Sequence, residues 1–93
     1  SQNELENLGK AARNEKQYDR AVAFYSQLQK QFPDNPNGWL GGALASTETK
    51  NYTAAKNALN VYKQRFGQDN AYLDAESYLL DFTEPDMAKL GRW

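Results

Sequence analysis

The apolar residues of this chain recur at intervals of three and four positions, which is the spacing of one face of an α-helix. The pattern runs from Tyr18 to Phe32 and again from Tyr52 to Phe66. The first copy has apolar residues at Ala21, Phe24, Tyr25, Leu28 and Phe32. The second copy has them at Ala55, Ala58, Leu59, Tyr62 and Phe66. Each segment is predicted to be an amphipathic helix, and the small alanine that opens both stripes indicates a close helix contact.

The segments that precede these two helices also match each other. KQYDRA at 16–21 recurs as KNYTAA at 50–55. At the same interval, Leu5, Leu8, Gly9 and Ala12 correspond to Trp39, Gly42, Ala43 and Ser46, and a third copy begins with Leu73, Ser77 and Leu80. The chain is therefore predicted to hold about two and a half units, each made of a first helix A and a second helix B.

Residues typical of helix starts and helix ends lie at the boundaries of these units. Asn35 precedes Pro36 as an N-cap before the first helical position, and Gly67 suits a helix end. Asp69 or Asn70 suits the next N-cap, and the run 83–86 resembles a capping box. We expect helices at 3–15, 18–31, 36–49, 52–66, 70–82 and 84–90, and no strands.

The spacing between these units resembles that of the tetratricopeptide repeat, a helix–turn–helix unit with a period of about 34 residues. The first unit, 2–35, carries its pattern at Leu5, Leu8, Gly9, Ala12, Ala21, Tyr25 and Pro33; the second, 36–69, carries it at Trp39, Ala43, Ala55 and Leu59. The second unit departs from the family pattern at Gly42 and Gly67, and the third departs at Glu76. Residues 70–93 therefore look like a partial repeat that caps the stack.

The resemblance implies the fold. We expect an all-α, right-handed superhelical stack of antiparallel helix pairs, that is, a tetratricopeptide-like solenoid with a C-terminal capping helix. Residues 1–93 would form a single domain, a fragment of a larger protein.

The resemblance also implies a function. In this family the A helices line a concave surface that binds peptides, partner helices or other proteins, and catalysis is rare. Positions on that face include Glu6, Thr47 and Asp81. The residues predicted to contact a partner are Lys10, Arg13, Asn37, Leu40, Leu44, Asp74 and Tyr78.

The stretch WLGGALA at 39–45 has two interpretations. Each glycine in a helix interior costs about 0.8–1.0 kcal/mol relative to alanine, so the pair Gly41 and Gly42 indicates a close approach. That approach is either tight packing between helices or an apolar groove floor, built on Leu40 and Leu44, that accepts a partner. In the second interpretation Tyr78 extends the floor.

Composition narrows the function classes. The chain has no Cys and no His, which removes thiolate and imidazole chemistry and most zinc sites. The acids between 69 and 86 lack the spacing of a calcium loop, and Asp74 and Asp81 are better explained by a solvated helix face than by catalysis. We expect no enzyme activity, no metal and no cofactor. No apolar run is long enough to cross a bilayer, and the net charge of −1 does not favour nucleic acid.

Charge is nevertheless uneven along the chain. Residues 1–68 carry nine basic and six acidic side chains, whereas residues 69–86 carry six acids and no base. This acidic end is either a solvated face or a field that orients a partner.

A second function stays open beside the scaffold. The domain could be a structural segment of a longer solenoid or a self-associating module, as in bacterial cell-envelope proteins that assemble, export or secrete polymers. That analogy favours the periplasm or cell envelope over the cytoplasm, and the compartment remains undecided. Partners are therefore expected to be a protein, a peptide, further repeats or a second copy of the chain.

Overall fold

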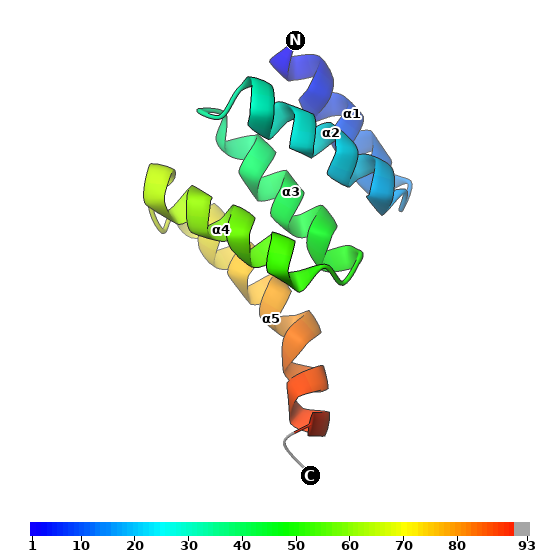
Figure 1. The fold of residues 1–93 in the computed structure, drawn as a ribbon, viewed down its shortest axis with the longest axis vertical. Helices are drawn as coiled ribbons and strands as arrows, with labels where there is room; N and C mark the ends of the chain where they lie inside the picture. Colours follow the sequence, from blue (N-terminus) through cyan, green and yellow to red (C-terminus); the bar gives the residue numbers. More distant parts are fainter. Residues whose placement is uncertain (91–93) are drawn as a thin grey trace.

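A computed structural model describes the backbone of residues 1–90 and the side chains as far as Pro85. Five helices follow one another and are joined by short turns (Figure 1). The first five predicted helices are confirmed to within one residue at each end, except at the C-terminal end of the fifth. The helices are α1 (Gln2–Asn14), α2 (Tyr18–Gln31), α3 (Pro36–Glu48), α4 (Tyr52–Phe66) and α5 (Asn70–Leu90).

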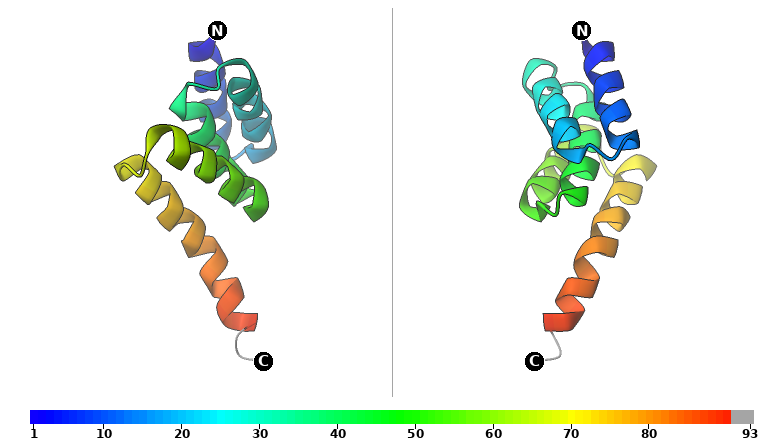
Figure 2. Two further views of the ribbon diagram at one scale, coloured as in Figure 1. Left: turned by 60° about the vertical axis from the view of Figure 1, so that its left-hand side comes forward. Right: turned by 90° about the vertical axis from the view of Figure 1, so that its right-hand side faces the viewer.

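The helices form two antiparallel pairs and a fifth helix stacked against the second pair. Helix α1 packs on α2 and α3 packs on α4, while α3 also lies against α1 and α2. Helix α5 packs against α3 and α4 in the same way that α3 packs against α1 and α2. Figure 2 shows the C-terminal half of α5 extending beyond the other four helices. The arrangement is the all-α repeat stack predicted from the sequence.

The turn between the helices of a pair has the same backbone in both pairs. Lys16 and Lys50 both have positive φ, at 61° and 64°. The next N–H donates back into the helix in each case, from Gln17 to the Ala12 carbonyl at 2.8 Å and from Asn51 to the Ser46 carbonyl at 2.9 Å. These bonds satisfy carbonyls that the helix end leaves unpaired. The recurring KxY motif therefore marks a repeated turn.

Polar side chains cap the later helices as the sequence predicted. The Asn35 carboxamide accepts from the Asn37 N–H at 3.0 Å, and Gly67 ends α4 with φ 87°. Asp69 caps α5, because its carboxylate accepts from the Tyr72 N–H at 2.9 Å and from the Tyr62 hydroxyl at 2.8 Å. The Tyr72 donor, followed by the Tyr62 hydroxyl, lowers the pKa of Asp69. Burial and then Asp69 raise the pKa of Tyr62.

Two apolar clusters form the core, and α3 belongs to both. The first cluster contains Ala45 of α3 and the second contains Ala43. The remaining buried residues of the first cluster are Leu5, Ala12, Ala21, Tyr25 and Leu28. Those of the second are Ala55, Ala58, Leu59, Tyr62, Tyr72, Ala75 and Leu79. Helix α3 thus joins one repeat to the next.

Glycines let α1 and α3 approach the aromatic ring of Tyr25 on α2. A Cβ at Gly9 would lie 2.6 Å from Tyr25 Cζ, and one at Gly41 would overlap the same ring. A Cβ at Gly42 would meet the Gln29 side chain. These glycines therefore allow tight helix packing. This agrees with the first interpretation of the stretch WLGGALA.

The predicted helix break at 83–86 is wrong. Helix α5 continues through Pro85 to Leu90, and the Thr83 hydroxyl donates to the Leu80 carbonyl at 3.5 Å instead of capping a new helix. Proline removes one N–H bond and crowds the carbonyl four residues earlier. Pro85 is exposed, and α5 continues through it without ending.

Three leucines aligned with core positions are exposed instead. Leu8, Leu73 and Leu80 are 45%, 47% and 44% exposed. Leu8 lies on α1 at the N-terminal edge of the stack, and the other two lie on α5, where Leu80 borders a hollow between α4 and α5. Each would need a further helix to cover it. The capping helix therefore has an outer face that is partly apolar rather than wholly polar.

Candidate functional site

The A helices α1, α3 and α5 follow one another along one side of the stack (Figure 2). We call the predicted partner-binding residues on these helices the A-helix surface. Its members on α1 and α3 line a common depression of about 70 Å³ together with Tyr25 and Gly41. They are Lys10, Arg13, Asn37, Leu40 and Leu44, and Glu6 lines the same depression.

A hydrogen bond joins the two helices at the rim of this depression. The Asn37 carboxamide donates to Glu6 Oε1 at 2.6 Å. One turn earlier, the Asn35 carboxamide donates to Gln2 Oε1 at 3.0 Å. Asn37 is therefore engaged in holding α1 against α3.

Leucines form the floor of the depression and cations stand beside it. Leu40 and Leu44 are half-buried and pack against the second core cluster. Lys10 is exposed and Arg13 is half-buried. The ion pairs found among the described residues join Ser1 to Glu4 and Arg65 to Asp34, so neither cation is neutralised by a direct partner.

The predicted residues of α5 lie outside this depression. Asp74 is exposed, and the half-buried Tyr78 pairs its ring with that of Phe82 at a centroid distance of 5.1 Å. Thr47, a further candidate, is not at the surface. It is buried, and its hydroxyl donates to the Ala43 carbonyl at 2.8 Å, as serine and threonine often do inside helices.

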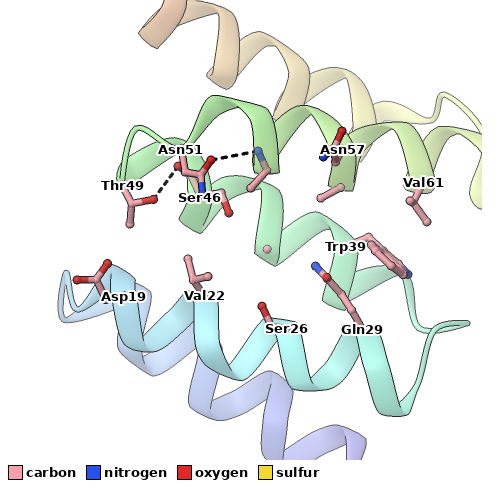
Figure 3. A pocket seen from close by; sticks show the side chains of 13 residues that line it. Asp19, Val22, Ser26, Gln29, Trp39, Ser46, Thr49, Asn51, Asn57 and Val61 are labelled. Carbon is pink, nitrogen blue, oxygen red and sulfur yellow. Dashed lines mark hydrogen bonds between the residues drawn. The ribbon is translucent and has the colours of Figure 1, made fainter.

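Sequence reasoning missed a larger hollow on the other side of α3. We call it the interhelix cleft: α2 and α4 form its walls, α3 forms its floor, and its volume is about 410 Å³ (Figure 3). Its lining is Asp19, Val22, Ser26, Gln29, Trp39, Gly42, Ser46, Thr49, Asn51, Ala54, Asn57, Ala58 and Val61.

Several polar groups of the interhelix cleft already have structural partners. The Thr49 hydroxyl donates to the Ser46 carbonyl at 2.9 Å, the Asn51 carboxamide caps α4 at Ala54, and the Gln29 amide donates to the Gly38 carbonyl at 3.0 Å. Val22, Ser26 and Gln29 line the cleft and form a second stripe one residue after the core stripe of α2, but this stripe does not show how far α4 lies from α2. Hydrophobicity alone could not find the cleft.

A third hollow of about 420 Å³ lies between α4 and α5. The Tyr72 hydroxyl donates to Glu76 Oε2 at 2.9 Å on its wall, and burial followed by this carboxylate raises the pKa of Tyr72. We call this space the α4–α5 hollow. It is lined by Lys56, Leu59, Asn60, Tyr72, Glu76, Leu79 and Leu80.

Neither metal binding nor membrane insertion is indicated by the described residues. They contain no group of three Asp or Glu side chains placed to hold an ion, and none of their helices has the length and apolarity of a bilayer span. The pKa shifts of Tyr62, Asp69 and Tyr72 arise at the α4–α5 junction, where capping and packing contacts account for them.

Comparison with known proteins identifies the family. No significant match to a curated protein or to a solved structure was found. The family model described as tetratricopeptide repeat matches residues 12–77. This range runs from the end of α1 into α5 and covers most of the chain, including both repeated turns. The five helices and the regular interval between the two turns agree with that match, and the chain belongs to the tetratricopeptide repeat family.

Proposed function

We propose that this chain is a protein-interaction module that holds a peptide or a partner helix on the A-helix surface. Tetratricopeptide repeats generally mediate protein–protein interaction and are typically scaffolds without enzymatic activity. The observation that carries the proposal is the depression in which Leu40 and Leu44 of α3 lie beside Lys10 and Arg13 of α1.

The chemistry of this surface suits a partner with an apolar anchor and an acidic side chain. Burying one Leu- or Phe-sized side chain on the leucine floor stabilises the complex by about 1.5–3 kcal/mol. Each exposed ion pair with Lys10 or Arg13 contributes about 0.2–1 kcal/mol. Asp74 and Tyr78 continue the surface on α5, where the charge is opposite. Apolar contact therefore supplies affinity, and charge sets the direction in which the partner lies.

Selection of binding peptides from a random display library tests this proposal. A selected peptide should bind the native chain, and its affinity for Lys10→Glu/Arg13→Glu should fall by about tenfold. Leu40→Asp/Leu44→Asp should abolish binding, provided that circular dichroism shows retained helicity.

A matched control reverses two exposed cations elsewhere, as Lys30→Glu/Lys63→Glu on α2 and α4. This control should bind like the native chain. If the selected peptides lose affinity equally in both charge-reversed variants, or if their amide shift changes map to the interhelix cleft, the A-helix surface is not the site.

The alternative function, a self-associating or structural segment of an envelope protein, makes a different prediction. If the chain self-associates, its sedimentation coefficient should rise with protein concentration in the absence of any peptide. A mass that stays monomeric over that range favours the scaffold.

A further inference from the structure

Helix α5 carries the sequence register of an A helix but has no B helix of its own among the described residues. On α1 and α3, three positions of the A helix lie on the side of the B helix that follows, and the same three positions recur on α5. They are Leu5, Gly9 and Ala12 on α1, Trp39, Ala43 and Ser46 on α3, and Leu73, Ser77 and Leu80 on α5, each set one repeat interval after the last. We call the third set the open stripe.

The first two sets are covered. Leu5, Gly9 and Ala12 are buried beneath α2, where Gly9 faces the Tyr25 ring. Ala43 is buried beneath α4, and Trp39 packs against the same cluster. Ser46 is also buried, on the floor of the interhelix cleft that α4 helps to form. In the open stripe, by contrast, Leu73 is 47% exposed and Leu80 is 44% exposed, and Ser77 is exposed as well.

The opposite side of α5 is anchored, so the open stripe cannot turn inward. Tyr72, Ala75 and Leu79 are buried in the second core cluster. Leu80 also lines the α4–α5 hollow, whose other wall is formed by α4. Of the open stripe, Leu80 borders the hollow, while Leu73 and Ser77 lie on the exposed surface of α5. We call the open stripe and the hollow together the seat; by register it corresponds to the place that a B helix occupies in the preceding units.

We propose that this seat docks a basic amphipathic helix supplied by a partner protein. The chain itself shows which stripe fits: a small residue, then large residues four and seven positions later. Helix α2 presents Ala21, Tyr25 and Leu28 in this way, and α4 presents Ala55, Leu59 and Tyr62. A helix of this type would bury both exposed leucines.

Charge complementarity makes that helix basic. Between residues 70 and 85, α5 carries four acids and no Lys or Arg; they are Asp74, Glu76, Asp81 and Glu84. Within this chain, α4 combines the required apolar stripe with Lys56, Lys63 and Arg65 and no acid. A helix of similar charge is attracted to α5, whereas the acidic α5 of a second copy would be repelled.

The open stripe differs from the A-helix surface, because Asp74 and Tyr78 each lie one residue beyond Leu73 and Ser77. The docking of a helix here and peptide binding beside Leu40 and Leu44 therefore use different apolar contacts. Variants at one site leave the other available as a control.

A labelled peptide with the sequence of residues 51–67 is the probe, since it contains α4 and its two caps. We expect it to bind the full 93-residue chain in a fluorescence anisotropy titration. Leu73→Asp/Leu80→Asp should weaken binding by at least about tenfold, because burial of two leucines is lost. Both side chains are exposed, so the variant should keep the native helicity.

Two controls are matched to this variant. Leu8→Asp changes a leucine of similar exposure at the other end of the stack and should bind like the native chain. A peptide with Leu59→Asp, which interrupts the apolar stripe, should not bind.

Several outcomes would overturn the proposal. Absence of peptide binding is one, and equal binding to the native chain and to Leu73→Asp/Leu80→Asp is another, since the peptide would then sit elsewhere. A concentration-dependent mass that Leu73→Asp/Leu80→Asp abolishes would make a second copy the occupant. Slow maleimide labelling of Leu73→Cys in the isolated monomer would mean that the chain covers its own stripe.

Discussion

Lys16 and Lys50 occupy the same strained position in two copies of one turn. Their φ angles of 61° and 64° lie in the left-handed region, which costs a residue with a Cβ about 1–2 kcal/mol. The hydrogen bonds from Gln17 and Asn51 keep both residues there. The turn fixes the antiparallel pairing of two helices, so a single backbone conformation determines the geometry of the repeat.

Glycine at these two turns should stabilise the protein. Lys16→Gly and Lys50→Gly each remove the Cβ penalty, while the unfolded chain gains some freedom that offsets part of the effect. We expect each to raise the free energy of unfolding by about 0.5–1 kcal/mol in urea titrations. Lys30→Gly, inside α2, is the control and should destabilise the chain by about 1 kcal/mol. A loss of stability at both turns would contradict this account of the strain.

At the scale of the element, α3 is the helix whose packing against α2 requires residues without side chains. It carries Gly38, Gly41 and Gly42 on the side that meets α2, and all three are buried. Helix propensity disfavours each of them, yet a Cβ at Gly41 would overlap the Tyr25 ring. Close packing of α2 on α3 outweighs the local preference for alanine.

Substitution of Gly41 by alanine distinguishes helix propensity from close packing, because the two effects change the stability of the protein in opposite directions. Propensity alone predicts that Gly41→Ala stabilises the chain by about 0.8–1.0 kcal/mol. We expect instead a loss of about 1–3 kcal/mol, since the added methyl group overpacks the contact with Tyr25. In Gly38→Ala the added Cβ would lie 3.1 Å from Leu28 Cγ, so we expect a smaller loss of stability than for Gly41→Ala. Thermal denaturation of both variants measures the difference, and a stabilised Gly41→Ala would exclude tight packing as the role of this glycine.

At the scale of the whole molecule, stability depends on whether the two core clusters unfold together. Ala43 and Ala45 are close neighbours on α3 and point into different clusters. In a repeat stack each unit contacts its neighbours, and the interface between units couples their unfolding. Helix α3 is that interface here, so we expect a single cooperative transition.

Cavity mutations at opposite ends of the stack test this coupling. Leu28→Ala in the first cluster and Leu79→Ala in the second should each cost about 2–5 kcal/mol. Hydrogen exchange should then accelerate by the same factor in α1–α2 and in α4–α5 for both variants. Acceleration confined to the mutated half would show that the halves open independently.

The candidate site was predictable in part. The interval of 34 residues gives Lys10 and Leu44 equal register on α1 and α3, and Arg13 and Leu40 each lie one helical turn from one of them. All four residues line one depression, because A helices of equal register present the same side of the stack. Its contact with a partner remains a prediction. The interhelix cleft was not predictable, since it depends on how far α2 and α4 stand apart, and that distance follows from packing on α3.

The sequence by itself determined the helices, their pairing and the repeat. Local signals suffice for this: periodicity, caps such as Asn35 and Asp69, and a turn written twice around Lys16 and Lys50. Only the tertiary structure decided which aligned residues are buried. Leu73 and Leu80 have the register of core residues but remain exposed, and α5 continues through Pro85 where a break was predicted. Burial depends on whether another helix is present to exclude water, and no local pattern contains that information.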